Sequence, residues 1–459
     1  MQSTRCGQCT LRFCRARRDM RMRWSVGVLL GVLTLPALAD VRVNVEDHQG
    51  RADRVPIITV EGLAAAEAIQ LRLSMQDSAG QRWQSQAVLR ADLQGIVDTS
   101  RSGSEQGSYR GIDASGLIWS MQPQEGRARA LPVQWQRSGD GVGFQPQTFE
   151  LEVERAGSVV ARRSLQRHLM LPGVRVQRVQ IEGRPAHLYL PADLKTDAGA
   201  PAVVALGGAE GGFDGGDLYA AWLASNGYVA LSVAWYRGPG VPKDLIEVPL
   251  ETVRDAVHWL QRHPCVDPQR VGLMGGSWGG IVTMATAVHL PGLRAAVSWV
   301  GSPAPFRGIA RDVAPADFRA VERSPLSWQG RPLPWLPYRE EIDWGRPGPQ
   351  WEPALRAAML PIGNIAARTL WIGGGDDRLG DSGVMMAVAQ RQLAAAGRGT
   401  RDRFLYYADA GHLLTPILQP TTHRHDVGPF IDVGGTAEGH ALADREVGPA
   451  VLAFLAEAL

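Results

Sequence analysis

The sequence has little cysteine and no excess of charge of one sign. Four of its 459 residues are cysteine, and three of them, Cys6, Cys9 and Cys14, precede residue 40. Cys265 is the cysteine that remains after residue 40, and alone it cannot form an intramolecular disulfide. A fold held by disulfides is therefore excluded for the chain from residue 40 onward. The 48 Lys and Arg residues balance 46 Asp and Glu residues, which gives no reason to expect a nucleic acid partner. The hydrophobic share of 45% is that of a soluble globular protein, and the length favours two domains.

The first 39 residues have the pattern of a secretory signal peptide. Seven arginines precede the apolar run 24–35, and small residues stand three and one positions before a cut after Ala39. We therefore expect an exported protein, periplasmic or extracellular, that begins at Asp40, is soluble after cleavage and keeps no stable membrane span. Met20 or Met22 would give a more ordinary start, and an N-terminal membrane anchor is the alternative.

Residues 40–170 consist of short runs in which polar and apolar residues alternate, separated by Gly, Asp and Ser turns. This period of two predicts an antiparallel β-sandwich of immunoglobulin-like type. Residues 107–121 alternate little. Tyr109, Trp119 and Met121 there are candidates for a contact surface, although packing in the core and between domains is favoured. The predicted strands are 42–45, 56–60, 69–75, 83–88 and 149–153.

After Pro172 the pattern changes to alternating strands and helices. Such alternation predicts a mostly parallel sheet that is covered by helices on both faces. An opening hairpin is expected at 176–191. Further strands are expected at 202–206, 228–233, 293–300, 367–372 and 403–407, with one more running into the turn at 275–279, and helices at 218–226, 250–263 and 281–288.

Gly275, Ser277 and Gly279 form a G-x-S-x-G pattern at the end of a predicted strand. The pattern is typical of a nucleophile elbow, in which a serine on a strained strand-to-helix turn presents its hydroxyl above the sheet. A Cβ two residues before or after the serine would collide with the neighbouring strand or helix, which explains the glycines. An ordinary glycine-rich turn is the alternative. We predict Ser277 as a nucleophile.

Two late strands are followed by the residues that a serine nucleophile needs. Asp376 and Asp377 follow strand 367–372, and His412 follows strand 403–407, which is the expected order of acid and then histidine. His412 would take the serine proton, and a carboxylate would hold its ring in the right tautomer. Asp377 is the predicted acid. Asp376 is the alternative, because the sequence does not say which carboxylate faces the ring.

The loop 207–216, which follows strand 202–206, is rich in glycine. It contains neither a G-x-G-x-x-G pattern nor a P-loop, so nucleotide binding is disfavoured and no cofactor is expected. We expect the loop to supply one donor of an oxyanion hole, the backbone N–H of Ala209 or a neighbour. The N–H of Trp278 would supply the other.

A stretch rich in Pro and Trp, residues 301–353, has no clear period and is predicted to form a cap over the strand ends. Its arginines would suit a polyphosphate, whereas Glu210 and Asp214 in the loop 207–216 argue against one. Packing alone is the alternative role for its tryptophans. The candidate walls of an acyl pocket are Trp328, Trp335, Trp344 and Trp351, and the arginines are Arg307, Arg311, Arg319, Arg323 and Arg331.

Three residues near the C-terminus have side chains of the kind that bind metals: His423, His425 and Asp426. No third ligand cluster accompanies them, so a solvated loop is favoured over a metal site and no metal is expected. His440 has no predicted role.

In combination these features resemble the acyl-CoA thioesterase and bile acid-CoA:amino acid N-acyltransferase family over nearly the whole chain after residue 40. The resemblance implies an immunoglobulin-like domain at 40–170 and a catalytic domain of the α/β-hydrolase fold at 171–459. It also implies that Ser277, Asp377 and His412 are nucleophile, acid and base. The segments that carry it are 83–87, 91–92, 95–98, 107–121, 275–280, 374–377, 410–412 and 434–440.

This sequence departs from the family pattern in two places. The family's thioesterases commonly have a lysine after the serine, where this chain has Trp278. Its transferases use cysteine as the nucleophile, where this chain has Ser277. Because serine favours water over an amine acceptor, the second departure points to hydrolysis.

The sequence thus predicts a serine acyl hydrolase that acts on a small-molecule ester or thioester through an acyl-Ser277 intermediate. Acyl-CoA thioester hydrolysis follows from the resemblance. An exported carboxylesterase for non-CoA esters is the alternative, because an exported enzyme would not ordinarily meet coenzyme A. Export leads us to expect a higher kcat/KM for simple acyl esters than for acyl-CoA of equal chain length. A peptidase, an acyltransferase and a non-catalytic binding protein are weaker alternatives, and no oligomeric state is indicated.

Overall fold

The computed structural model describes residues 40–126, 135–194, 199–310, 319–337, 351–424 and 432–459. The predicted signal peptide lies outside the described residues, as do Arg311, Trp344, His425 and Asp426. Residues Asp40–Leu459 form one compact unit. In the part of the chain that is described, no helix combines the length and the apolar character that crossing a bilayer requires.

The region of residues 40–170, here called the sandwich region, contains two antiparallel sheets. Each of the five predicted strands coincides with an observed one, so these predictions are confirmed; the immunoglobulin-like type stays a prediction. One sheet has the order β6-β4-β3-β8-β9 with β7 paired to β4, and the other has the order β1-β2-β5. The strands are β1 (Arg42–Glu46), β2 (Ile57–Glu61), β3 (Ala68–Gln76), β4 (Arg82–Arg90), β5 (Val97–Asp98), β6 (Ser104–Gly107), β7 (Gln122–Pro123), β8 (Gln147–Arg155) and β9 (Ser158–Arg167).

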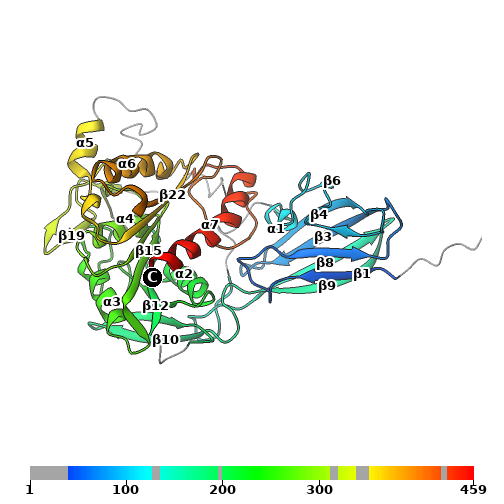
Figure 1. Cartoon of the computed structure of the whole chain (residues 1–459), viewed down its shortest axis with the longest axis horizontal. Helices are drawn as coiled ribbons and strands as arrows, with labels where there is room; N and C mark the ends of the chain where they lie inside the picture. The colour runs from blue at the N-terminus through cyan, green and yellow to red at the C-terminus, as the bar shows by residue number, and fades with distance from the viewer. Residues whose placement is uncertain (1–39, 127–134, 195–198, 311–318, 338–350, 425–431) are drawn as a thin grey trace, which may run out of the picture. The chain divides into compact units, whose positions relative to one another are not determined.

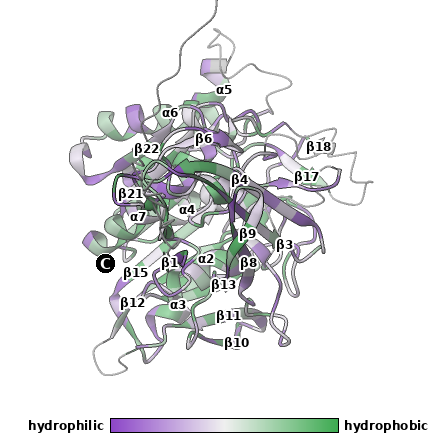
Figure 2. Cartoon of the chain, turned by 90° about the vertical axis from the view of Figure 1, so that its right-hand side faces the viewer, coloured by the Kyte–Doolittle hydropathy of each residue, from purple (hydrophilic) through white to green (hydrophobic). Residues whose placement is uncertain are grey.

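Strand β3 shows why these residues form strands. Every second residue from Ile69 to Met75 is buried, since successive side chains point to opposite faces of a sheet. In Figure 2 the colours along β3 and β4 accordingly mix hydrophilic and hydrophobic residues. Tyr109, Trp119 and Met121 are buried, and Trp119 closes the short helix α1 (Gly116–Trp119). Their predicted packing role is confirmed.

The region of residues 171–459, here called the hydrolase region, is built on an eight-stranded sheet. Its order is β10-β11-β13-β12-β15-β16-β21-β22. The first two strands form the predicted hairpin, β11 and β13 are antiparallel, and all later neighbours are parallel. The strands are β10 (Arg175–Ile181), β11 (Arg184–Leu190), β12 (Ala200–Leu206), β13 (Val229–Val233), β15 (Val266–Gly276), β16 (Ala295–Trp299), β21 (Arg368–Gly374) and β22 (Arg403–Tyr407).

Helices cover both faces of this sheet (Figure 1). Val203 and Ala205 of β12 belong to the core with α2 (Asp214–Ala224) and α7 (Ala437–Ala458). Val204 and Leu206 belong to the core with α3 (Glu251–Gln261), α4 (Trp278–Ala287) and α6 (Ser382–Ala395). A strand that is buried on both faces consists of consecutive apolar residues. The polar and apolar residues of these strands therefore do not alternate as they do in residues 40–170. The arrangement is the predicted α/β-hydrolase fold.

Helix α2 begins four residues earlier than predicted, at Asp214 rather than Leu218. Gly215 and Gly216 disfavour a helix by intrinsic propensity. A Cβ on Gly216 would lie 2.7 Å from Ser232 Oγ and 3.0 Å from Ala205 O. Close packing of the first turn of α2 on the sheet therefore overrides propensity at this point.

The predicted cap contains short strands: β17 (Gly308–Ala310), β18 (Arg319–Val321), β19 (Leu326–Trp328) and β20 (Arg331–Pro332). Helix α5 (Trp351–Ala358) follows. Strand β19 pairs in parallel with β14 (Val248–Pro249). The cap stretch thus packs beside the connection that leads from β13 to α3.

Candidate active site

Ser277 occupies the turn between β15 and α4, with φ 54° and ψ −120°. A positive φ is strained for any residue with a Cβ. The turn is held to strand β16 because Ser277 N–H donates to Trp299 O at 2.7 Å. A Cβ on Gly275 would lie 2.3 Å from the backbone of Gly279, and a Cβ on Gly279 would lie 2.5 Å from Gly207 O. The predicted steric reason for both glycines is confirmed.

Gly275→Ala should therefore destabilise the protein. Because a backbone carbonyl, and not a flexible side chain, stands in the way, we expect the free energy of unfolding to fall by about 1–3 kcal/mol. Urea denaturation measures the change. Gly292→Ala is the matched control, since its Cβ would meet only Gln261 Nε2 at an ordinary 3.6 Å. Equal denaturation midpoints for the two variants would contradict this account of the turn.

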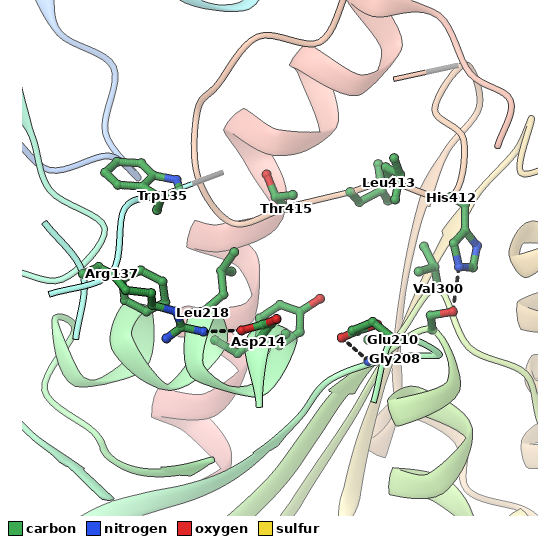
Figure 3. Close-up of a pocket in the computed structure, with 16 residues that line it drawn as sticks. Trp135, Arg137, Gly208, Glu210, Asp214, Leu218, Val300, His412, Leu413 and Thr415 are labelled. Atoms are coloured by element: carbon green, nitrogen blue, oxygen red, sulfur yellow. Dashed lines mark hydrogen bonds and ion pairs between the residues drawn. The ribbon is translucent and has the colours of Figure 1, made fainter. Parts of the chain in front are cut away.

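His412 joins the serine to a carboxylate. Its Nε2 is 2.7 Å from Ser277 Oγ, the contact marked by the dashed line at His412 in Figure 3. Its Nδ1 is 2.8 Å from Asp377 Oδ2. The loop after β22 carries His412, whose backbone N–H donates to Val433 O at 2.8 Å. The structure thus brings the three residues predicted from separate segments into one hydrogen-bonded series.

Asp377 is the carboxylate that faces the ring. It is almost fully buried, and its Oδ1 accepts the N–H groups of Leu379 at 3.0 Å and Gly380 at 2.8 Å. Burial by itself would raise the pKa of Asp377. The facing His412 and the hydrogen bonds to the carboxylate outweigh burial and hold this pKa below its ordinary value. The carboxylate therefore stays ionised and can stabilise a protonated imidazole.

Asp376 points away from the ring. Its Oδ1 lies 2.9 Å from Arg378 Nε, and its Oδ2 accepts Gly435 N–H at 2.9 Å. Gly435 belongs to the segment whose Val433 O holds His412. His440, for which the sequence indicated no role, is buried on α7 with its Nε2 3.2 Å from Gly434 O. Asp376 and His440 thus brace the segment behind the histidine.

Of the two predicted oxyanion donors, Trp278 directly follows Ser277 in the chain, whereas Ala209 is outside the cavity lining. Trp278 is the first residue of α4, so its N–H belongs to a helix N-terminus, where N–H groups point out of the helix. Ala209 does not line the cavity at Ser277, whereas its neighbour Gly208 does. A Cβ on Gly208 would lie 3.1 Å from Ser277 Cβ. Gly208 is therefore the loop residue beside Ser277, and the pair of glycines after β12 was the signal for it.

A cavity of about 540 Å³ opens at Ser277 and His412. Three of its lining residues, Trp135, Arg137 and Phe144, come from the sandwich region, in which the sequence showed no catalytic constellation. Arg137 Nη2 bonds Asp214 Oδ1 at 2.7 Å, and its Nη1 bonds Asp217 Oδ2 at 2.9 Å. These bonds hold residues 135–144 against the first turn of α2. No sequence signal could have found them, because the contacts are long-range.

Trp328 and Trp335 do not line this cavity, so the wall role predicted for these two is wrong. Trp328 stacks on His289 at 4.1 Å instead, and Trp335 is half-buried outside the cavity lining. Only the backbone of Trp351 is described. Three of the cap arginines do not line the cavity either. Arg307 pairs with Glu322 and Arg323 with Glu247, each at 2.9 Å, and Arg331 is exposed.

The expectation of a solvated loop at 421–426 is wrong for its described part. Thr421 and Arg424 are fully buried. Thr421 N–H donates to Trp119 O at 3.0 Å, and His423 lies 4.3 Å from the ring of Trp83. The segment is an internal contact with the sandwich region. In the described residues no group of three or more His, Cys, Asp or Glu is placed to hold a metal.

Two family models match the chain. Residues 53–181 match the acyl-CoA thioester hydrolase/BAAT N-terminal region, and residues 248–459 match the BAAT/acyl-CoA thioester hydrolase C terminal. Among curated proteins, acyl-coenzyme A thioesterase 1 of Rattus norvegicus is 29% identical, covering 85% of this chain and 90% of that protein. The peroxisomal succinyl-coenzyme A thioesterase of Mus musculus is 28% identical, covering 88% and 93%.

Solved structures match at lower similarity. A dienelactone hydrolase-like promiscuous phosphotriesterase from metagenomic libraries is 16% identical and covers 62% of this chain and 98% of its own, with a TM-score of 0.40. A score this low carries no argument about function.

Proposed function

Since this chain belongs to the acyl-CoA thioester hydrolase/BAAT family, we propose that it is a serine-dependent acyl hydrolase that cleaves acyl thioesters through an acyl-Ser277 intermediate. The observation that carries the proposal is the series Asp377–His412–Ser277, with contacts of 2.8 and 2.7 Å, at the wall of a cavity. A serine, a base within hydrogen-bond reach and a third group that orients the base are the parts that nucleophilic acyl transfer needs.

The chemistry follows from these contacts. Ser277 Oγ attacks the acyl carbonyl carbon while His412 Nε2 takes the hydroxyl proton, and Asp377 stabilises the imidazolium. The bond from the carbonyl carbon to sulfur or oxygen breaks, and His412 returns the proton to the leaving group. Water then attacks acyl-Ser277 with His412 as base, which releases the carboxylic acid and restores the serine. The N–H of Trp278, the first residue of α4, would stabilise the carbonyl oxygen as it becomes negative, whereas the Gly208 N–H already donates to Glu210 Oε1 at 2.8 Å.

A second candidate function, hydrolysis of non-CoA acyl esters by an exported enzyme, has support from the charges at the cavity. Coenzyme A carries a 3′-phosphate and a pyrophosphate, which call for basic side chains or helix N-termini. Arg137 is the arginine among the described residues that line the cavity. Its guanidinium is already bonded to Asp214 and Asp217. The predicted export signal points the same way.

Three substrates with one acyl chain separate these candidates: a simple oxygen ester, a thioester of a small uncharged thiol, and the acyl-CoA. We expect the chain beginning at Asp40 to hydrolyse the oxygen ester and the small thioester with a higher kcat/KM than the acyl-CoA, and free coenzyme A to inhibit weakly. The reason is that the described cavity offers a polyphosphate no cation that is not already ion-paired. Fastest turnover of the acyl-CoA would contradict the second candidate and leave CoA thioester hydrolysis as the function.

A further inference from the structure

Two carboxylates, Glu210 and Asp214, line the cavity, and Glu210 lies close to Ser277. Glu210 Oε1 accepts Gly208 N–H at 2.8 Å. Its Oε2 and Ser277 Cβ lie 3.0 and 3.1 Å from the point that a Cβ of Gly208 would occupy. Burial, and then the charge of Glu210, raise the pKa of the Tyr219 phenol in the same wall. In Figure 3 Glu210 lies between Arg137 on the left and His412 on the right. An acyl group bound in the cavity would therefore lie near a carboxylate.

Arg137, the arginine in the lining, does not provide an unpaired positive charge for an anionic group on the substrate. Arg137 Nη1 donates to Asp217 Oδ2 and Val142 O, each at 2.9 Å. Its Nη2 donates to Asp214 Oδ1 at 2.7 Å, and its Cζ lies 4.3 Å above the ring of Phe144. The positive charge of Arg137 is thus met by two carboxylates, of which Asp217 is buried and Asp214 is exposed.

Apart from Ser277, His412, Tyr219 and Thr415, the rest of the lining is apolar or glycine. It includes the side chains of Trp135, Phe144, Leu218, Val300 and Leu414. An aliphatic chain gains free energy by leaving water for such a surface, whereas a carboxylate loses hydration there and finds no unpaired cation in return. The polyanionic part of a CoA thioester would be excluded for the same reason, so the acyl part is the one that fits the cavity.

We propose that this cavity accepts uncharged acyl chains and excludes acyl chains that end in a second carboxylate, with Glu210 and Asp214 as the specificity-determining residues. The inference rests on the proposed function, because it assumes an acyl substrate at Ser277. It separates this chain from the similar mouse protein that is named for a succinyl thioester. Repulsion between like charges several Å apart near a protein surface is strong enough for discrimination of about tenfold or more, and salt weakens it.

The test compares two substrates with the same leaving group and equal chain length, one ending in a methyl group and one in a carboxylate. The readout is the ratio of their kcat/KM values, which a merely structural change would not move. In the wild type we expect the neutral chain to be favoured at least about tenfold. Glu210→Gln and Asp214→Asn should each shift the ratio toward the carboxylate by about tenfold. Asp214→Asn acts twice, because it also releases Arg137 Nη2 from its ion pair.

Glu322→Gln is the matched control. It removes the same unit of charge from an exposed side chain that pairs with Arg307 and lies outside the cavity lining. We expect it to leave the ratio within about twofold, since exposed charges that are distant from the site are screened by salt.

The inference is overturned if the wild type hydrolyses both chains equally well, or if neither cavity variant moves the ratio more than Glu322→Gln does. Failure of the proposed function looks different: the wild type then hydrolyses neither substrate and is not labelled by a fluorophosphonate probe. Circular dichroism of each variant checks that it is folded before its ratio is compared.

Discussion

Ser277→Ala is expected to lower turnover by roughly 10³-fold or more. The loss follows because alanine has no oxygen to form the acyl intermediate, and the contact of 2.7 Å to His412 Nε2 disappears. Initial rates on a chromogenic acyl ester measure it. His412→Ala should cost a similar factor, since the serine then has no base, and the double variant should be scarcely worse than either single one, because the residues act as a unit.

A fluorophosphonate probe provides the control. It should label the wild-type protein covalently at Ser277 and leave Ser277→Ala unlabelled, with both proteins unfolding at the same temperature. Retained activity in Ser277→Ala would remove the serine mechanism. Absence of labelling together with absence of turnover in the wild type would instead indicate a non-catalytic binding protein on a hydrolase scaffold.

Asp377→Asn should cost far more activity than Asp376→Asn. The carboxylate of Asp377 accepts from His412 Nδ1 at 2.8 Å, and an amide there neither fixes the ring tautomer nor stabilises the imidazolium. We expect kcat to fall on the order of 10³-fold or more. Asp376 contacts Arg378 and Gly435 instead, so Asp376→Asn should lower kcat by less than about tenfold while lowering stability by about 1 kcal/mol.

Steady-state kinetics and urea denaturation of the two Asn variants test this ranking. The substitutions are matched, since each replaces one of two adjacent carboxylates by its isosteric amide. A reversed ranking of kcat would transfer the orienting role to Asp376. Equal and severe losses of both kcat and stability would show that the loop after β21 had collapsed in both variants.

The sequence by itself determined those features that depend on neighbours along the chain. Alternation with period two located the strands of the sandwich region, as Ile69 to Met75 in β3 illustrate. The alternation of predicted strands and helices after Pro172 indicated the mostly parallel sheet. The glycines around Ser277 identified the elbow because the backbone of a tight turn leaves no room for a Cβ on either side. The order of Asp377 and His412 after late strands identified their partners, since the carboxyl ends of parallel strands meet at one edge of a sheet.

Only the tertiary structure decided which side chains meet across elements. Asp376 and Asp377 are adjacent and chemically identical, and the path of the loop after β21 alone turns one toward His412 and the other toward Gly435. Gly208 rather than Ala209 lies beside Ser277 because of how the chain leaves β12.

The walls of the cavity were also decided by the tertiary structure. Arg137 reaches them through ion pairs with α2 that span about 80 positions of sequence, while Trp328, which the sequence proposed as a wall, packs on His289. Such contacts are set by the packing of whole elements against one another. That packing depends on many weak long-range interactions at once and leaves no periodic or local trace in the order of residues.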